Sequence, residues 1–130
     1  MNARDKWEAV LDHYRHPVNY GTMPGANAKG KDSNVLCGDS IEMHLKIADN
    51  KIEDIRFQGQ GCAISLAATS MLTETVKGKA LSEVSKLTEK DIMALLGIDV
   101  SASRVECAIL GLNVLKRMVS EWAGAGANKS

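Results

Sequence analysis

Polar and apolar residues alternate in the middle of the chain, and this pattern predicts a β-hairpin. From Ile41 to Ile47 every second side chain is apolar, which is the period of a strand with one buried and one wet face. His44 falls on the outward face, where we expect solvent. Asp49-Asn50-Lys51 then forms the turn, because asparagine tolerates the left-handed backbone of hairpin turns. A second strand follows through Ile55 and Phe57.

The first third of the chain predicts a short helix, a loop and a further strand. Pro17 bars continuation of a helix over residues 4–15. Residues 18–33 are rich in Gly, Asn and Pro, which is typical of an extended, mobile loop. Val35 and Leu36 predict a short strand before Cys37 and so a sheet of three antiparallel strands. The apolar stripe of the first helix is Trp7, Val10, Leu11 and Tyr14.

The second half of the chain follows the 3.6-residue period of helices. The pattern predicts a helix from Cys62 to about Gly78, followed by a helical turn over 81–87. A capped helix over 88–97 comes next, because a threonine cap precedes it and a glycine ends it. The last helix is expected over 104–122. Residues 123–130 have nothing to bury and are expected to form a disordered tail.

Composition limits the size and the setting of the protein. The 130 residues are 45% apolar, enough for one domain over 1–130 that buries roughly two thirds of its unfolded surface. The 16 basic and 16 acidic side chains cancel, so the excess of positive charge that nucleic acids and anionic membranes attract is absent. No stretch approaches the ~20 apolar residues of a membrane span. We therefore expect a cytoplasmic protein without nucleic-acid or membrane partners.

The three cysteines lie at predicted junctions between elements. Cys37 precedes Gly38, whose tight turn lets the carboxylate of Asp39 reach the sulfur. Cys62 begins a helix, where unbonded N–H groups and the helix dipole favour a thiolate. Cys107 falls in the first turn of the last helix, one turn after Arg104. All three thiols are therefore expected to lose their protons more easily than a buried thiol.

Two interpretations of these cysteines remain open on spacing alone. Free cysteine is among the most buried residue types, so each of the three can be a small apolar core residue. In a reducing compartment thiols are also often metal-binding or catalytic. The chain has no C-x-x-C pair, and widely spaced cysteines are a weak metal signal. The glycines and the carboxylate beside the thiols favour chemistry.

Four stretches carry a family resemblance that covers nearly the whole chain. They are His16-Pro17-Val18-Asn19-Tyr20-Gly21, Cys37-Gly38-Asp39, Gly59-Gln60-Gly61-Cys62-Ala63-Ile64-Ser65 and Arg104-Val105-Glu106-Cys107. In this order they resemble the iron–sulfur cluster assembly scaffolds, also called U-type scaffolds or the NifU N-terminal domain family. The resemblance implies an α+β domain with a small antiparallel sheet packed against helices. It also implies that Cys37, Cys62 and Cys107 converge at one end, with Asp39 beside them.

The resemblance implies a scaffold and carrier that is not an enzyme. Such a protein receives sulfur from a cysteine desulfurase, builds a [2Fe-2S] cluster on Cys37, Asp39, Cys62 and Cys107, and transfers it to apo iron–sulfur proteins. Soft thiolates hold iron firmly, whereas the hard oxygen of Asp39 makes one corner labile. Either Cys37 or Cys107 can accept the sulfur.

The alternative is a zinc-dependent sulfurtransferase that takes persulfide sulfur from the desulfurase. Arg104-x-x-Cys107 is similar to the branch with zinc in the site, whose members usually carry an insertion that is missing here between Gly78 and Gly97. Glu106 stands where many members of the other branch carry His. Its carboxylate is either an oxygen ligand or a solvated group in the first turn of the helix. Segment 100–104 lacks the Leu-Pro-Pro-Val-Lys stretch that an Hsp70-type chaperone pair reads, so we do not expect that partner. The sequence does not decide between a monomer and a homodimer.

Overall fold

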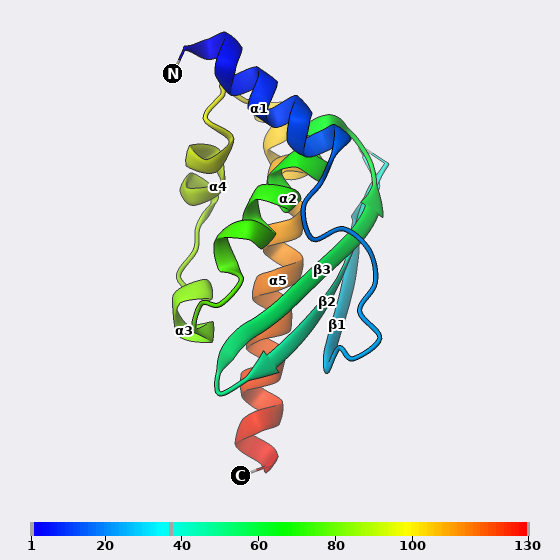
Figure 1. Ribbon diagram of the computed structural model, residues 1–130, viewed down its shortest axis with the longest axis vertical. Helices are drawn as coiled ribbons and strands as arrows, with labels where there is room; N and C mark the ends of the chain where they lie inside the picture. The colour runs from blue at the N-terminus through cyan, green and yellow to red at the C-terminus, as the bar shows by residue number, and fades with distance from the viewer. Residues whose placement is uncertain (1, 37, 130) are drawn as a thin grey trace.

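A three-stranded antiparallel sheet lies against a layer of helices, which confirms the predicted α+β fold (Figure 1). The computed structural model describes residues 2–36 and 38–129. The strands are ordered β1-β2-β3, and the long α5 runs along the molecule beside α2. The elements are α1 (Ala3–Arg15), β1 (Ala28–Asn34), β2 (Asp39–Ala48), β3 (Lys51–Gln60), α2 (Ala63–Val76), α3 (Leu81–Val84), α4 (Glu89–Leu96) and α5 (Ala102–Lys129).

The β2–β3 hairpin forms as the alternating pattern predicts. Ala48 pairs with Lys51, and the two residues between them are both left-handed, with φ of 54° at Asp49 and 58° at Asn50. This is the two-residue turn whose twist matches that of the flanking strands. The apolar side chains of one face are buried in the core. On β2 and β3 they are Ile41, Met43, Leu45, Ile47, Ile52, Ile55 and Phe57.

The third strand lies earlier than predicted. β1 spans Ala28–Asn34 inside the expected loop, whereas Val35 and Leu36 lie beyond it in a turn, 89% and 96% exposed. β1 is a polar edge strand, held by main-chain pairing with β2 and by the packing of Gly30 against Met118 of α5. Pairing of this kind leaves no alternating apolar signal, so the prediction from Val35 and Leu36 was wrong.

The segment before β1 is fastened to the sheet. Asn19 accepts a hydrogen bond through its main-chain oxygen from the Phe57 N–H (2.9 Å), and Gly21 donates to the Phe57 oxygen (2.7 Å). Met23 donates its N–H to Nδ1 of His44 (3.1 Å). His44 is therefore only 6% exposed, and the prediction of a solvated histidine was wrong because this segment covers the outward face of β2. We predicted a mobile loop here, but these hydrogen bonds hold residues 19–23 against the sheet.

The helices follow the predicted order with changed ends. α2 begins after Cys62, and α4 has the capping box between Thr88 and Asp91. α5 starts at Ala102, two residues early, so Cys107 lies in its second turn. α5 also continues to Lys129, where we predicted a helix end near Trp122 and a disordered tail. The alanines after Trp122 favour helix and no proline interrupts it, although Gly124 and Gly126 disfavour it.

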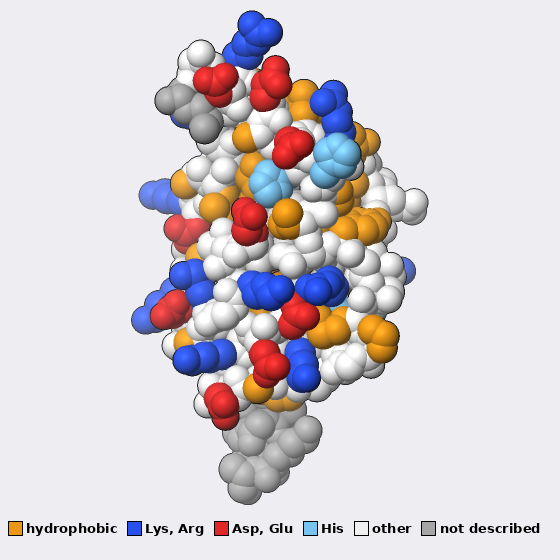
Figure 2. Space-filling view, viewed as in Figure 1, with side chains coloured by type: hydrophobic (Ala, Val, Ile, Leu, Met, Phe, Trp, Pro, Cys, Tyr) orange, Lys and Arg blue, Asp and Glu red, His pale blue; other side chains and the backbone are white. Residues whose placement is uncertain are grey.

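The surface carries charges of both signs. Figure 2 shows Lys and Arg interspersed with Asp and Glu on one face, as the zero net charge leads one to expect. Local ion pairs contribute to this pattern, such as Asp54 with Arg56 (2.7 Å) and with Lys77 (3.1 Å). Among the helices in the described part of the chain, none has both the length and the apolar character to span a membrane.

Substituting Gly111→Ala should destabilise the contact between α2 and α5. A Cβ at position 111 would lie 2.5 Å from Oγ1 and 3.1 Å from Cγ2 of Thr69, so either the Thr69 side chain must turn away or the helices must separate. We expect a loss of about 1–3 kcal/mol in the free energy of unfolding from overpacking, reduced by the ~1 kcal/mol that alanine gains over glycine in a helix. Denaturant unfolding of the apo protein measures it. Gly124→Ala, with no atom within 4 Å, is the control and should not destabilise. Equal effects at both positions would contradict the close-packed contact.

Candidate metal centre

Asp39, Cys62 and Cys107 meet at one end of the molecule. Their candidate ligand atoms all lie within 4.8 Å of one another. Three elements supply them: Asp39 is the first residue of β2, Cys62 is the N-cap of α2, and Cys107 lies on α5. Residues far apart in sequence thus form one donor cluster, as the family resemblance implies. Cys37, the fourth predicted member, lies outside the described residues.

The carboxylate of Asp39 is fixed against the start of α2. It is only 1% exposed, and its Oδ1 accepts a hydrogen bond from the Cys62 N–H (2.9 Å). Its Oδ2 lies 3.8 Å from Sγ of Cys62. Gly61 makes this approach possible, because a Cβ there would overlap the carboxylate. The glycine before the cysteine therefore serves the geometry of the site.

The start of α2 adds positive electrostatic character to the cluster. Cys62 caps the helix without a side-chain hydrogen bond, so the first N–H groups of the helix have no side-chain acceptor from that residue. Unbonded N–H groups at a helix start, together with the helix dipole, favour anions. Thiolates and a metal–sulfide group are both anionic. The centre is thus suited to negatively charged sulfur.

Access to the cluster runs past Cys62. This side chain is half-buried, whereas Cys107 is fully buried at 0% exposure. An open cavity of about 390 Å³ lies beside Cys62, between the start of α1 and the start of α5. Its walls include Trp7, Asp99, Val100 and Arg104. A reactant can therefore reach Cys62 without passing through the core.

The residues that precede Cys107 in its motif, Arg104 and Glu106, differ in their positions. Arg104 lines the cavity beside Cys62, and both Arg104 and Glu106 are exposed. Glu106 is not among the residues whose ligand atoms meet in the cluster. Sequence reasoning missed Trp7 as a wall of the site, since helical spacing placed it in the core stripe. Trp7 is 44% exposed, whereas Val10 of the same stripe is fully buried.

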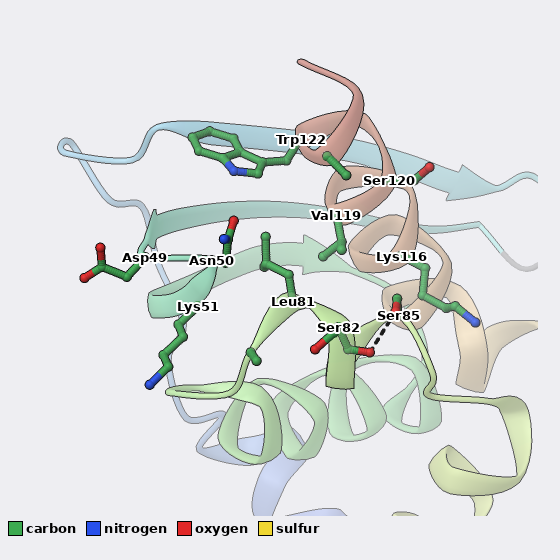
Figure 3. Close-up of a pocket in the computed structure, with 12 residues that line it drawn as sticks. Asp49, Asn50, Lys51, Leu81, Ser82, Ser85, Lys116, Val119, Ser120 and Trp122 are labelled. Carbon is green, nitrogen blue, oxygen red and sulfur yellow. Dashed lines mark hydrogen bonds between the residues drawn. The ribbon is translucent and has the colours of Figure 1, made fainter. Parts of the chain in front are cut away.

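A larger cavity, of about 930 Å³, lies away from the donor cluster. It is formed where the β2–β3 turn, α3 and α5 meet, and Leu81, Val119 and Trp122 are among its walls (Figure 3). In that view the Asp49 carboxylate points away from Trp122. The β2–β3 turn follows the far end of β2, roughly 30 Å along the strand from Asp39. The described walls of this larger cavity include neither cysteine nor histidine. The donor cluster is therefore the candidate metal centre.

The sequence of this chain matches a known protein family along nearly its whole length. The model of the NifU-like N-terminal domain matches residues 5–129. The chain belongs to this family. The donor cluster therefore lies within the matched region, and the resemblance drawn from the four sequence motifs is confirmed.

Members of the family with different described roles are similar to this chain. The iron-sulfur cluster assembly scaffold protein IscU 1 of Archaeoglobus fulgidus is 36% identical over 115 residues, which cover 88% of this chain and 74% of that protein. The zinc-dependent sulfurtransferase SufU of Bacillus subtilis is 29% identical over 134 residues, with 90% of each chain covered. The crystal structure of FiSufU from Fervidobacterium islandicum AW-1 superposes with a TM-score of 0.75 at 25% identity, covering 86% of this chain and 94% of that one.

Proposed function

We propose that this protein is a scaffold for iron–sulfur cluster assembly. It receives sulfur from a cysteine desulfurase, assembles a [2Fe-2S] cluster on Cys37, Asp39, Cys62 and Cys107, and passes the cluster to apo iron–sulfur proteins. The observation that carries the proposal is the convergence of the Asp39, Cys62 and Cys107 donor atoms within 4.8 Å at one end of the fold. The cluster is cargo in this role, and the protein is a carrier.

The donor set suits a cargo that must be released. Cysteine thiolates are the usual ligands of iron–sulfur clusters, and carboxylate oxygen is a harder and weaker partner for iron. Asp39 supplies that oxygen beside Cys62. A site with four thiolates would hold the cluster more firmly, which suits electron transfer better than delivery. The mixed set therefore favours a scaffold.

Sulfur transfer begins with attack of a thiolate on the outer sulfur of the desulfurase persulfide. The new S–S bond forms on this protein, the S–S bond of the donor breaks, and the desulfurase cysteine leaves as a thiolate. Of the two described thiols, Cys62 is half-buried beside a cavity and Cys107 is fully buried. We therefore propose that Cys107 is not the thiolate that attacks the persulfide and that it serves as a ligand. An external reductant supplies the electrons that convert sulfane sulfur to sulfide.

Leu36 is expected to contact the desulfurase. Val35 and Leu36 are 89% and 96% exposed next to Cys37, and apolar groups exposed at a reactive centre are typical of a docking surface. Leu36→Asp should weaken binding to the desulfurase roughly tenfold, equivalent to about 1.4 kcal/mol. Titration of the two proteins measures it. The control Ser120→Asp adds the same charge at an exposed position of α5. Equal affinity of the two variants would remove Leu36 from the interface.

The second candidate is a zinc-dependent sulfurtransferase. Two observations favour it: the similarity to the zinc-dependent sulfurtransferase SufU of Bacillus subtilis along 90% of each chain, and the position of Arg104 in the wall of the cavity beside Cys62. In that role Zn²⁺ would occupy the Asp39, Cys62 and Cys107 donors, and sulfur would leave as persulfide. A zinc ion also prefers thiolate and carboxylate ligands.

A transfer experiment distinguishes the two candidates. The protein is incubated without oxygen with a cysteine desulfurase, L-cysteine, ferrous iron and a reductant, then separated and mixed with an apo ferredoxin. The scaffold proposal predicts a sulfide-containing chromophore on this protein that moves stoichiometrically to the ferredoxin. Persulfide on this protein without iron, with ferredoxin maturing only from iron in solution, would favour the sulfurtransferase.

A further inference from the structure

A buried hydroxyl group in the first turn of α2 has no hydrogen-bond partner among the described residues. Ser65 is 0% exposed, and its Oγ is the buried side-chain nitrogen or oxygen for which the described part of the chain offers no hydrogen-bond partner. Other hydroxyls of α2 are satisfied: Thr69 donates to the main-chain oxygen of Ser65 (2.9 Å) and Thr73 to the main-chain oxygen of Ser70 (2.7 Å). An unsatisfied buried hydroxyl costs about 1–3 kcal/mol, so its presence calls for an explanation.

Ser65 lies between two points at which α2 touches α5. At the first, the Cys62 sulfur approaches that of Cys107 in the donor cluster. At the second, Thr69 packs against Gly111. Both helices therefore run away from the metal centre in the same direction. Since Ser65 is four residues before Thr69 and Cys107 is four before Gly111, helical geometry places Ser65 on the α5-facing side at the level of Cys107.

We propose that Ser65 is a positioning residue of the metal centre, whose hydroxyl donates a hydrogen bond to the thiolate of Cys107 when the site holds its metal cargo. The inference rests on the proposed function. Cys107 is fully buried, and a sulfur that carries negative charge away from water is stabilised by each hydrogen bond that it accepts. The same hydrogen bond would add less at Cys62, because Cys62 is half-buried and lies beside the open cavity. Rotation about χ1 of Ser65 redirects the hydroxyl while the backbone stays in place.

The hydroxyl then has opposite effects in the two states of the protein. Without metal it is a buried group without a described partner, which lowers the stability of the fold. With metal it stabilises the charge on sulfur and draws electron density from it. A hydrogen bond to a ligating sulfur raises the reduction potential of an iron–sulfur cluster. It also holds the Cys107 ligand in place, which slows loss of the cargo.

Ser65→Ala tests the proposal in both states. The apo protein should melt at the same temperature as the wild type or higher. The loaded variant, reconstituted with ferrous iron and sulfide, should lose its cluster to a chelator severalfold faster, and its reduction potential should be lower. Ser65→Thr retains the hydroxyl and should restore the potential. Loss of apo stability with an unchanged potential would overturn the proposal and assign Ser65 a structural role alone.

Ser70→Ala is the matched control on the same helix. Its hydroxyl accepts from the Val18 N–H (2.9 Å) and pairs with Nδ1 of His13 (2.8 Å), so its removal should lower apo stability and leave the reduction potential unchanged. A wild-type protein that binds neither iron nor zinc would contradict the proposed function itself. A wild type that holds a cluster with the same potential and release rate as Ser65→Ala would contradict only the role of Ser65.

Discussion

Cys62→Ser is expected to abolish stable binding of the cluster while leaving the fold intact. The substitution replaces a soft thiolate by a hydroxyl that remains protonated near neutral pH, so the donor cluster loses a ligand next to Asp39. Serine is a preferred N-cap, and residue 62 occupies the N-cap of α2. The apo protein should therefore unfold at the same temperature as the wild type or higher, which separates loss of the ligand from loss of the fold.

Visible absorption and iron content after anaerobic reconstitution measure this effect. Ala63→Ser is the matched control, since it adds a hydroxyl at the next position without removing sulfur. It should retain the cluster. A Cys62→Ser protein that holds iron and sulfide as long as the wild type would show that Cys62 is not a ligand and would remove the donor cluster as the basis of the function.

Asp39→Ala is expected to slow delivery of the cluster. The Asp39 carboxylate is the hard oxygen donor of the set, and it is fixed by the Cys62 N–H at 2.9 Å. Without this carboxylate the cluster has no weak iron–oxygen bond at which a ligand of the acceptor protein can begin to exchange. We expect transfer to an apo ferredoxin to slow roughly tenfold, equivalent to about 1.4 kcal/mol in the barrier.

The control for this variant is Asp99→Ala. Asp99 is an exposed carboxylate in the wall of the cavity beside Cys62, outside the donor cluster. Its removal should leave the rate of transfer unchanged. Transfer from Asp39→Ala at the wild-type rate, or faster, would show that the carboxylate does not form the labile corner.

The alternating and helical patterns predicted most of the fold, because burial against one core imposes those periods on the sequence. The β2–β3 hairpin and α2 are examples. β1 escaped prediction because main-chain pairing with β2 holds this polar strand. His44 was misplaced for a related reason: Met23, distant in sequence, covers the outward face of β2. Contacts between distant segments leave no local period.

The family resemblance predicted that Asp39, Cys62 and Cys107 lie together, whereas the surroundings of these residues were less predictable. The glycines and Asp39 beside the cysteines indicated metal chemistry, and the donor atoms of Asp39, Cys62 and Cys107 do converge. The full burial of Cys107 follows from the packing of α5 against the other elements, α2 among them, and not from the local sequence. The hydroxyl of Ser65, which has no partner in the described part of the chain, has no signature in sequence, since the packing of α2 on α5 removes it from water.

The metal content of the protein purified without oxygen tests the central proposal most directly. Iron, zinc and acid-labile sulfide are quantified in one preparation before and after reconstitution with ferrous iron and sulfide. For a scaffold, we expect iron and sulfide to enter in equal amounts and any zinc to be displaced as the cluster forms. Stoichiometric zinc that persists on the Asp39, Cys62 and Cys107 site and blocks reconstitution would contradict the scaffold function.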